Sequence, residues 1–140
     1  MKTMQHLFAT CCLVLWWFVP QNVAAQGHYS FPLKDSTRNY VRLLFAGDAM
    51  QHSVQFKWAW DAKNRQYDYE PNFRYLRPYL ADADVSVVNF ETTLSGKPYG
   101  GYPKFRTPDA FFGALVDAGF QIFALANNHI LDGDKRGMQR

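Results

Sequence analysis

Residues that can bind a metal ion or transfer a proton occur in three short motifs, each placed directly after an apolar run. The motifs are Gly47-Asp48, Asn89-Phe90-Glu91 and Asn127-Asn128-His129. Carboxylate and amide oxygens, together with a histidine, suit divalent ions such as Mg²⁺, Mn²⁺, Fe²⁺ or Zn²⁺. An imidazole can also exchange a proton near neutral pH. The sequence therefore predicts a divalent-metal site with an acid–base group beside it.

Each motif also has an ordinary structural interpretation. A Gly-Asp pair after a strand is commonly a turn, and Glu91 could be a solvated loop acid. Asn127 or Asn128 could adopt a left-handed turn conformation, and His129 could be a polar cap. The functional interpretation is favoured because all three apolar runs end in potential ligands.

The three apolar runs predict the strands that would position these motifs. They are Val41–Ala46, Val85–Val88 and Ile122–Ala126. Short apolar runs of this kind are typical of strands buried on both faces of a parallel sheet. In open α/β sheets, ligands bind beyond the carboxyl ends of the strands, so the three motifs are expected to converge at one edge.

Helical patterns separate the predicted strands and imply an α/β fold with parallel pairing. Apolar spacing predicts a helix through Phe73, Leu76 and Leu80, with Pro78 near a start or a kink. A second helix is expected to start at Thr107-Pro108-Asp109, with the Thr107 hydroxyl as N-cap, and to end at Gly119. Residues 50–69 have no clean period and predict a long loop, while Asp132 or Asp134 is expected to cap a last helix.

The N-terminus has the features of an export signal. Lys2 precedes an apolar run, Leu7–Val19, and small residues at Val23 and Ala25 suit cleavage before Gln26. An uncleaved anchor is the alternative. We therefore expect a signal peptide at 1–25, a flexible segment at 26–40 and one domain at 41–140, in an exported protein that is periplasmic or extracellular. Whether it also associates with the membrane is left open.

Composition restricts the class of protein. Of the 140 residues, 48% are hydrophobic and 19% charged, which favours a folded domain over a disordered chain. A formal charge of +3 with scattered Lys and Arg gives no reason to expect nucleic acid as a partner. The aromatic share is 17%, and aromatic residues either stack on sugars or peptides or, as is more common, fill the core and its rim.

The motifs, taken in order, resemble those of a known family. They are Phe45-Ala-Gly-Asp48, the segment 83–92, and Ala124-Leu-Ala-Asn-Asn-His-Ile-Leu-Asp132, with the segment 104–108 also fitting. This order is similar to the CapA family of bacterial capsule or poly-γ-glutamate synthesis proteins, whose domain is related to the calcineurin-like metallophosphoesterases. The resemblance implies a layered α/β sandwich of which this chain supplies the N-terminal half.

The same resemblance implies roles for individual residues. Asp48, Glu91 and Asn128 fall at metal-ligand positions, and His129 falls where a histidine stabilises or protonates the leaving group. The sequence departs from the phosphoesterase pattern at Met50, where a histidine is expected, and at Glu91, where the bridging ligand is an aspartate. Asn89 also stands in place of a glycine. A single metal ion or a repurposed pocket is therefore an alternative to a two-metal site.

Three further residues are candidates for contact with substrate: Asn89, Arg106 and Asn127. Arg106 could bind an acidic substrate such as polyglutamate or phosphate. The alternative is that it is an ordinary surface arginine.

The resemblance implies a capsule or poly-γ-glutamate biosynthesis factor. In one version it is a metal-dependent hydrolase that cuts a phosphoester or a γ-glutamyl amide. In the other it is a non-catalytic polymer-binding or scaffolding subunit of a capsule-export assembly. The expected partners are an anionic polymer or phosphoester substrate and capsule-synthesis membrane proteins. Since a three-stranded parallel sheet has two faces to cover and open edges, residues 26–140 alone are expected to be inactive and to aggregate or unfold without a sharp transition.

The predicted cleavage site can be tested directly. Val23 and Ala25 satisfy the usual requirement for small residues, so the exported product should begin at Gln26 in an intact-mass measurement. A product that keeps Met1 and sediments with membranes would instead establish the anchor.

Overall fold

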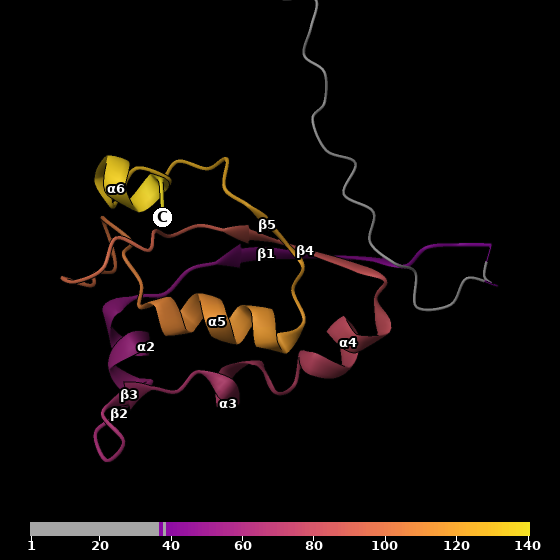
Figure 1. The fold of residues 1–140 in the computed structure, drawn as a ribbon, viewed down its shortest axis with the longest axis horizontal. Coiled ribbons are helices and arrows are strands. Elements are labelled where there is room, and N and C mark those ends of the chain that lie inside the picture. Colours follow the sequence, from indigo (N-terminus) through magenta and orange to yellow (C-terminus); the bar gives the residue numbers. More distant parts are fainter. Residues whose placement is uncertain (1–36, 38) are drawn as a thin grey trace, which may run out of the picture. The chain divides into compact units, whose positions relative to one another are not determined.

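A parallel sheet organises the part of the chain that the computed structural model describes, Thr37 and residues 39–140 (Figure 1). Its strands are β1 (Leu43–Ala49), β4 (Val85–Phe90) and β5 (Ile122–Ala124), in the order β1-β4-β5 with both pairs parallel. The predicted α/β fold with a parallel sheet is confirmed. The predicted leader at 1–25 and most of the segment 26–40 lie outside the described residues.

Among the described residues, all helices but the last lie on one side of this sheet in Figure 1, and the last lies on the other side near the carboxyl ends of the strands. Pro78 stands at the start of α4, where a missing N–H costs no hydrogen bond. Within the described residues, no helix has both the length and the apolar character needed to cross a bilayer. The helices are α2 (Ser53–Trp58), α3 (Glu70–Phe73), α4 (Arg77–Asp82), α5 (Asp109–Ala118) and α6 (Asp134–Met138).

The core lies between the sheet and α5. Alternate residues of β4 point toward the helices, and Val88 and Phe90 are buried there. From α5, Phe111 and Leu115 are buried against them, and the rings of Phe90 and Phe111 lie 6.4 Å apart. The predicted apolar face of this helix is therefore the one that packs on the sheet.

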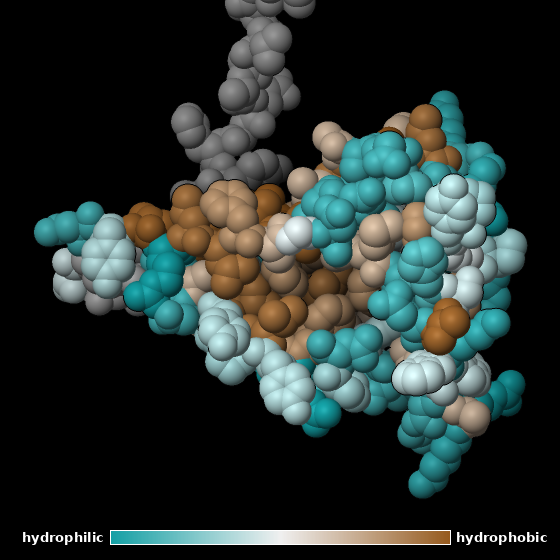
Figure 2. All heavy atoms as spheres, turned by 180° about the vertical axis from the view of Figure 1, so that it is seen from behind, coloured by the Kyte–Doolittle hydropathy of each residue, from teal (hydrophilic) through white to brown (hydrophobic). Residues whose placement is uncertain are grey.

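The other face of the sheet is open within the described residues, which contradicts the prediction that the first and third strands are buried on both faces. Phe45 is 71% exposed, and Leu43, Ile122 and Leu125 are also exposed. The physical reason is that α2 to α5 cover only one face, so every second side chain of β1 and β5 faces away from them. Figure 2 looks at the molecule from behind rather than onto this face, and it shows apolar side chains gathered around a hollow.

Residues 50–69 are not the predicted loop. They form α2 and a hairpin of β2 (Trp60–Asp61) with β3 (Gln66–Tyr67). Local hydrogen bonds hold both elements: the Gln55 side chain accepts from the His52 backbone N–H, and Asp61 accepts from the N–H groups of the hairpin turn. Elements this short leave no readable period in the sequence, which is why the prediction failed.

The predicted helix caps are displaced by one residue or more. The N-cap of α5 is Pro108, and the fully buried Thr107 hydroxyl meets the Gln51 side chain instead. The N-cap of α6 is Gly133, so neither Asp132 nor Asp134 caps it. Gly119 does end α5, as predicted, with a φ of 120°.

Gly113 within α5 and Gly119 at its C-cap provide a matched test of this fold. A Cβ on Gly119 would lie 3.2 Å from Leu80 Cβ at a positive φ, whereas a Cβ on Gly113 would meet nothing within 4 Å. Gly119→Ala should lower the free energy of unfolding by about 1–3 kcal/mol. Gly113→Ala should raise it by about 0.5–1 kcal/mol because helical glycine is entropically unfavourable. Denaturant melts measure both, and equal effects would contradict the assigned conformation of Gly119.

Candidate functional site

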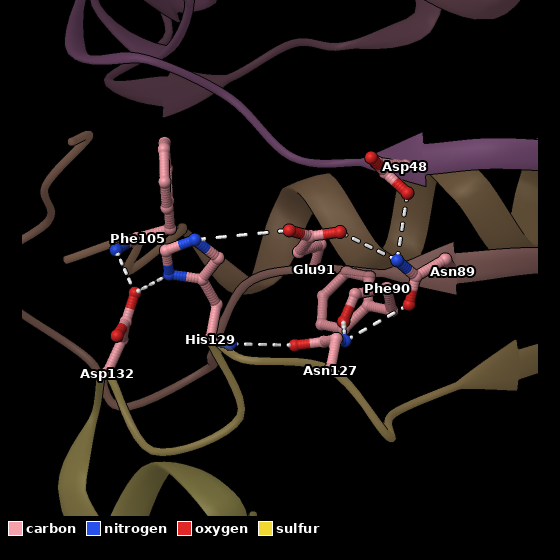
Figure 3. Close-up of polar contacts among 8 residues, drawn as sticks. All are labelled: Asp48, Asn89, Phe90, Glu91, Phe105, Asn127, His129 and Asp132. Atoms are coloured by element: carbon pink, nitrogen blue, oxygen red, sulfur yellow. Dashed lines mark hydrogen bonds and ion pairs between the residues drawn. The ribbon is translucent and has the colours of Figure 1, made fainter. Parts of the chain in front are cut away.

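The side-chain amide of Asn89 joins the ends of the three strands (Figure 3). Its Nδ2 donates to Asp48 Oδ1 at 2.8 Å and to Glu91 Oε2 at 2.7 Å. Its Oδ1 accepts from Asn127 Nδ2 at 3.1 Å. The convergence predicted from the three motifs is therefore present for Asp48, Asn89, Glu91 and Asn127.

Asp48 reaches this position through an irregularity in β1. Phe45 pairs with Val87 and Asp48 pairs with Asn89, so β1 has one more residue than β4 over the same span. An extra residue of this kind bends a strand and redirects its side chains. Asp48 is thus inside the strand, opposite Asn89, rather than in a turn after the strand.

His129 lies between two carboxylates. Its Nδ1 is 2.7 Å from Asp132 Oδ2, and its Nε2 is 3.9 Å from Glu91 Oε1. The side chains of His129, Glu91 and Asp132 are only 16%, 14% and 13% exposed. Because Asp132 is a natural acceptor for an Nδ1 hydrogen, Nε2 is the ring nitrogen left to face Glu91.

Phe105 fixes the imidazole from a second direction. Its backbone N–H donates to the same Asp132 Oδ2 at 2.6 Å, and its ring packs edge-on against His129 with centroids 4.7 Å apart. The sequence prediction included neither Phe105 nor Asp132 in the site. Asp132, three residues after His129, could have been found from that spacing, whereas a backbone donor such as Phe105 has no signal in the sequence.

Asn127 anchors the turn that carries His129. Its Nδ2 also donates to the Phe90 carbonyl at 3.1 Å, and its Oδ1 accepts from the His129 backbone N–H at 3.0 Å. These bonds engage the whole amide within the protein, so its role here is positional. The predicted contact of Asn127 with substrate remains a prediction.

Two predicted residues are not joined to this cluster. Asn128 is exposed, and no hydrogen bond of its side chain occurs within the described residues. The backbone of Arg106 pairs with Gly100 and bridges to Thr93, and its buried Nε has no hydrogen-bond partner among the described residues. Their roles as metal ligand and substrate contact remain predictions.

The side chains of the cluster are of the kinds that bind a divalent cation, but they are too few to hold one. Across Thr37 and residues 39–140, no three His, Cys, Asp or Glu side chains are close enough together to hold a metal ion. Asp48 and Glu91 do converge, but the point between them is occupied by the Asn89 amide nitrogen. Amide oxygens would have to complete the ligand set of a hard cation.

A cavity of about 360 Å³ adjoins Asp48 beneath the outer edge of β1. Phe73, Leu76 and other apolar side chains line it, together with the amides of Gln51 and Gln55. Tyr69 packs against Phe111 of the cavity lining, and burial raises the pKa of the Tyr69 hydroxyl to about 12, so it stays protonated at physiological pH. The cavity gives Asp48 a partly apolar space in which part of a bound molecule would fit.

The fold and this cluster define a parallel α/β domain with a carboxylate–amide–imidazole site at the carboxyl edge of its sheet. Residues 42–140 match the family described as bacterial capsule synthesis protein PGA_cap, and the chain belongs to this family. The predicted membership is therefore confirmed, as is a role in capsule synthesis. No curated protein matches the chain.

The position of His129 should depend on Asp132. Asp132→Ala removes the acceptor shared by Phe105 and His129, and should lower the free energy of unfolding by about 1–3 kcal/mol because a buried donor loses its partner. The ¹⁵N shifts of the imidazole should also show loss of the fixed tautomer. Asp132→Asn keeps one acceptor oxygen and should retain most of the stability.

Asp134→Asn is the matched control, since Asp134 is exposed and makes no side-chain cap bond in α6. Unchanged imidazole shifts in Asp132→Ala would contradict the proposed orientation of His129.

Proposed function

We propose that this protein is a hydrolase that acts on a capsule polymer or its precursor, with His129 as the acid–base group. The observation that carries the proposal is that His129 lies between Asp132 and Glu91, with one ring nitrogen facing each carboxylate. His129 is held at one nitrogen, while the other faces a second carboxylate 3.9 Å away. A side chain fixed in this way is suited to proton transfer to or from a reacting group.

The contacts of His129 suggest how it would work. With Nδ1 bonded to Asp132, Nε2 is the atom that would give a proton to a leaving group or take one from water. The Phe105 ring packs edge-on against the imidazole and helps to fix its orientation. Asp132 would orient the ring through Nδ1 and leave Nε2 directed toward the reacting group.

Asp48 and Glu91 are the residues that would hold a divalent cation, with an amide oxygen, for which Asn128 is the predicted source. A bound dication would make a coordinated water more acidic and polarise the bond to be cut. The two carboxylates already face one point, where both accept from the Asn89 amide. The Asn89 amide nitrogen would have to move from between them.

The proposed substrate is anionic: a phosphoester or a γ-glutamyl amide within an exported polymer. A cation between Asp48 and Glu91 would offset the charge of such a substrate, and Arg106 is the proposed second contact. The site of action would be periplasmic or extracellular, next to capsule-synthesis membrane proteins.

A non-catalytic polymer-binding or scaffolding role is the second candidate, and a specific observation favours it. Each carboxylate already accepts a hydrogen bond from the Asn89 amide, which occupies the point where a cation would bind. Met50, which replaces an expected histidine, is a poor ligand for a hard ion. Under this alternative the cluster is a structural network that joins three strands.

Metal content and capsule production together distinguish the two candidates. Elemental analysis of the purified full chain should find a divalent metal, and Asp48→Asn and Glu91→Gln should each lower it. His129→Ala should keep the metal but reduce capsule production in a complementation assay. Loss of an acid–base group lowers the turnover rate by about a hundredfold or more.

Asp117→Asn is the matched control, because Asp117 is an exposed carboxylate on α5 rather than in the cluster. Metal-free wild type that complements normally, with His129→Ala equally active, would establish the scaffolding role.

A further inference from the structure

A second cavity, of about 280 Å³, lies on the surface formed by α2, the hairpin and the loop after β4. It shares no residue with the polar cluster around Asn89. Three aromatic side chains and two lysines line it: Phe56, Lys57, Trp60, Tyr67 and Lys97. We call it the aromatic–lysine cavity.

The aromatic wall of this cavity is the outer end of a row of rings. Trp60 packs edge-on against Tyr67 with centroids 5.0 Å apart, and Tyr67 stacks on Tyr69 at 6.1 Å. Tyr69 in turn contacts Phe111 of the core at 5.2 Å. Trp60 nevertheless keeps 43% of its surface exposed. Rigid, exposed aromatic surface binds a ligand with little loss of conformational entropy.

The two lysines come from distant parts of the sequence. Lys57 is in the last turn of α2, and Lys97 is in the loop after β4. Both are exposed, and neither forms a salt bridge with any described residue. A lysine at a helix C-terminus is favourable by itself, which explains Lys57 but not its proximity to Lys97.

Asp61, an acidic residue of the hairpin, forms no salt bridge with these lysines. The Asp61 carboxylate accepts from the backbone N–H groups of Lys63 and Asn64 and from the Asn64 side chain. These hydrogen bonds lower its pKa and hold the carboxylate in the turn. Two like charges lining one cavity repel each other, and an anion between them removes that cost.

We propose that the aromatic–lysine cavity binds an acidic sugar unit of a polysaccharide, with the C–H face of a pyranose ring against Trp60 and its carboxylate between Lys57 and Lys97. A flat apolar face matched to an indole, combined with an anion, is the chemistry of a uronic acid. An extended chain of glutamates supplies the anion but no flat face. This binding is independent of the proposed hydrolase activity and of any metal ion.

Titration of the full chain with a short galacturonate oligomer tests the proposal. Galacturonate should bind, binding should weaken with added salt, and a neutral galactose oligomer of the same length should bind at least about tenfold more weakly, the equivalent of ~1.4 kcal/mol. Poly-γ-glutamate of similar charge should also be the weaker ligand.

Variants locate the binding. Trp60→Ala, and the double change Lys57→Gln with Lys97→Gln, should each weaken galacturonate binding about tenfold or more, a loss of ~1.4 kcal/mol. Trp58→Ala and Lys63→Gln are the matched controls. Trp58 is 87% exposed two residues from Trp60, Lys63 is exposed in the hairpin turn, and neither lines the cavity.

The lysine variants change only exposed side chains, so they keep the test valid even if Trp60→Ala disturbs the hairpin. Absence of galacturonate binding would overturn the proposal. Equal binding of galacturonate and neutral galactose would overturn it too, as would tighter binding of poly-γ-glutamate. Loss of metal or of capsule production in the Asn89 cluster variants, with galacturonate binding intact, would separate this site from the proposed catalytic one.

Discussion

The amide of Asn89 sits between two carboxylates at the end of the middle strand, and the arrangement of the candidate site depends on it. Two acidic side chains this close would repel each other if nothing separated them. The amide donates one N–H to Asp48 and one to Glu91, and its oxygen accepts a hydrogen bond from the Asn127 side chain. An uncharged group therefore links all three strand ends, and it also links them to the turn that carries His129.

The parts of the site that follow from a general rule could be predicted from the sequence. Parallel strands bring their carboxyl ends to one edge, so Asp48, Glu91 and His129 were expected to be neighbours. The bulge that turns Asp48 toward Asn89 could not be read from apolar spacing, because it depends on register between two strands. The sequence predicts Asp132 or Asp134 as a helix cap, because an acid before a short helix commonly has that role. Asp132 instead contacts His129, three residues before it, and accepts from the Phe105 N–H, 27 residues away, and only the first of these contacts has a signal in the sequence.

The burial of the sheet shows a different limit to what can be predicted from the sequence. Apolar content indicates that a strand prefers burial, but it does not indicate which neighbour provides it. Val88 and Phe45 belong to similar apolar runs, yet Val88 is buried under α5 while Phe45 is 71% exposed on the other face. The prediction for residues 50–69 failed for a related reason, because Asp61 and Gln55 hold these short elements through local hydrogen bonds rather than through a repeated pattern.

The orientation of His129 depends on more than the sheet. Gly133, at the N-terminus of α6, lies so close to Thr93 that a Cβ would be 2.6 Å from the Thr93 hydroxyl. The backbone of Thr93 pairs with Phe105 and Thr107, and the Phe105 N–H reaches Asp132. The turn from Asn127 to Gly133 is therefore held at its start by Asn89 and at its end by the segment around Thr93. Because both anchors are internal to the protein, the imidazole is oriented before any ligand binds, which is the condition under which a single histidine can transfer protons efficiently.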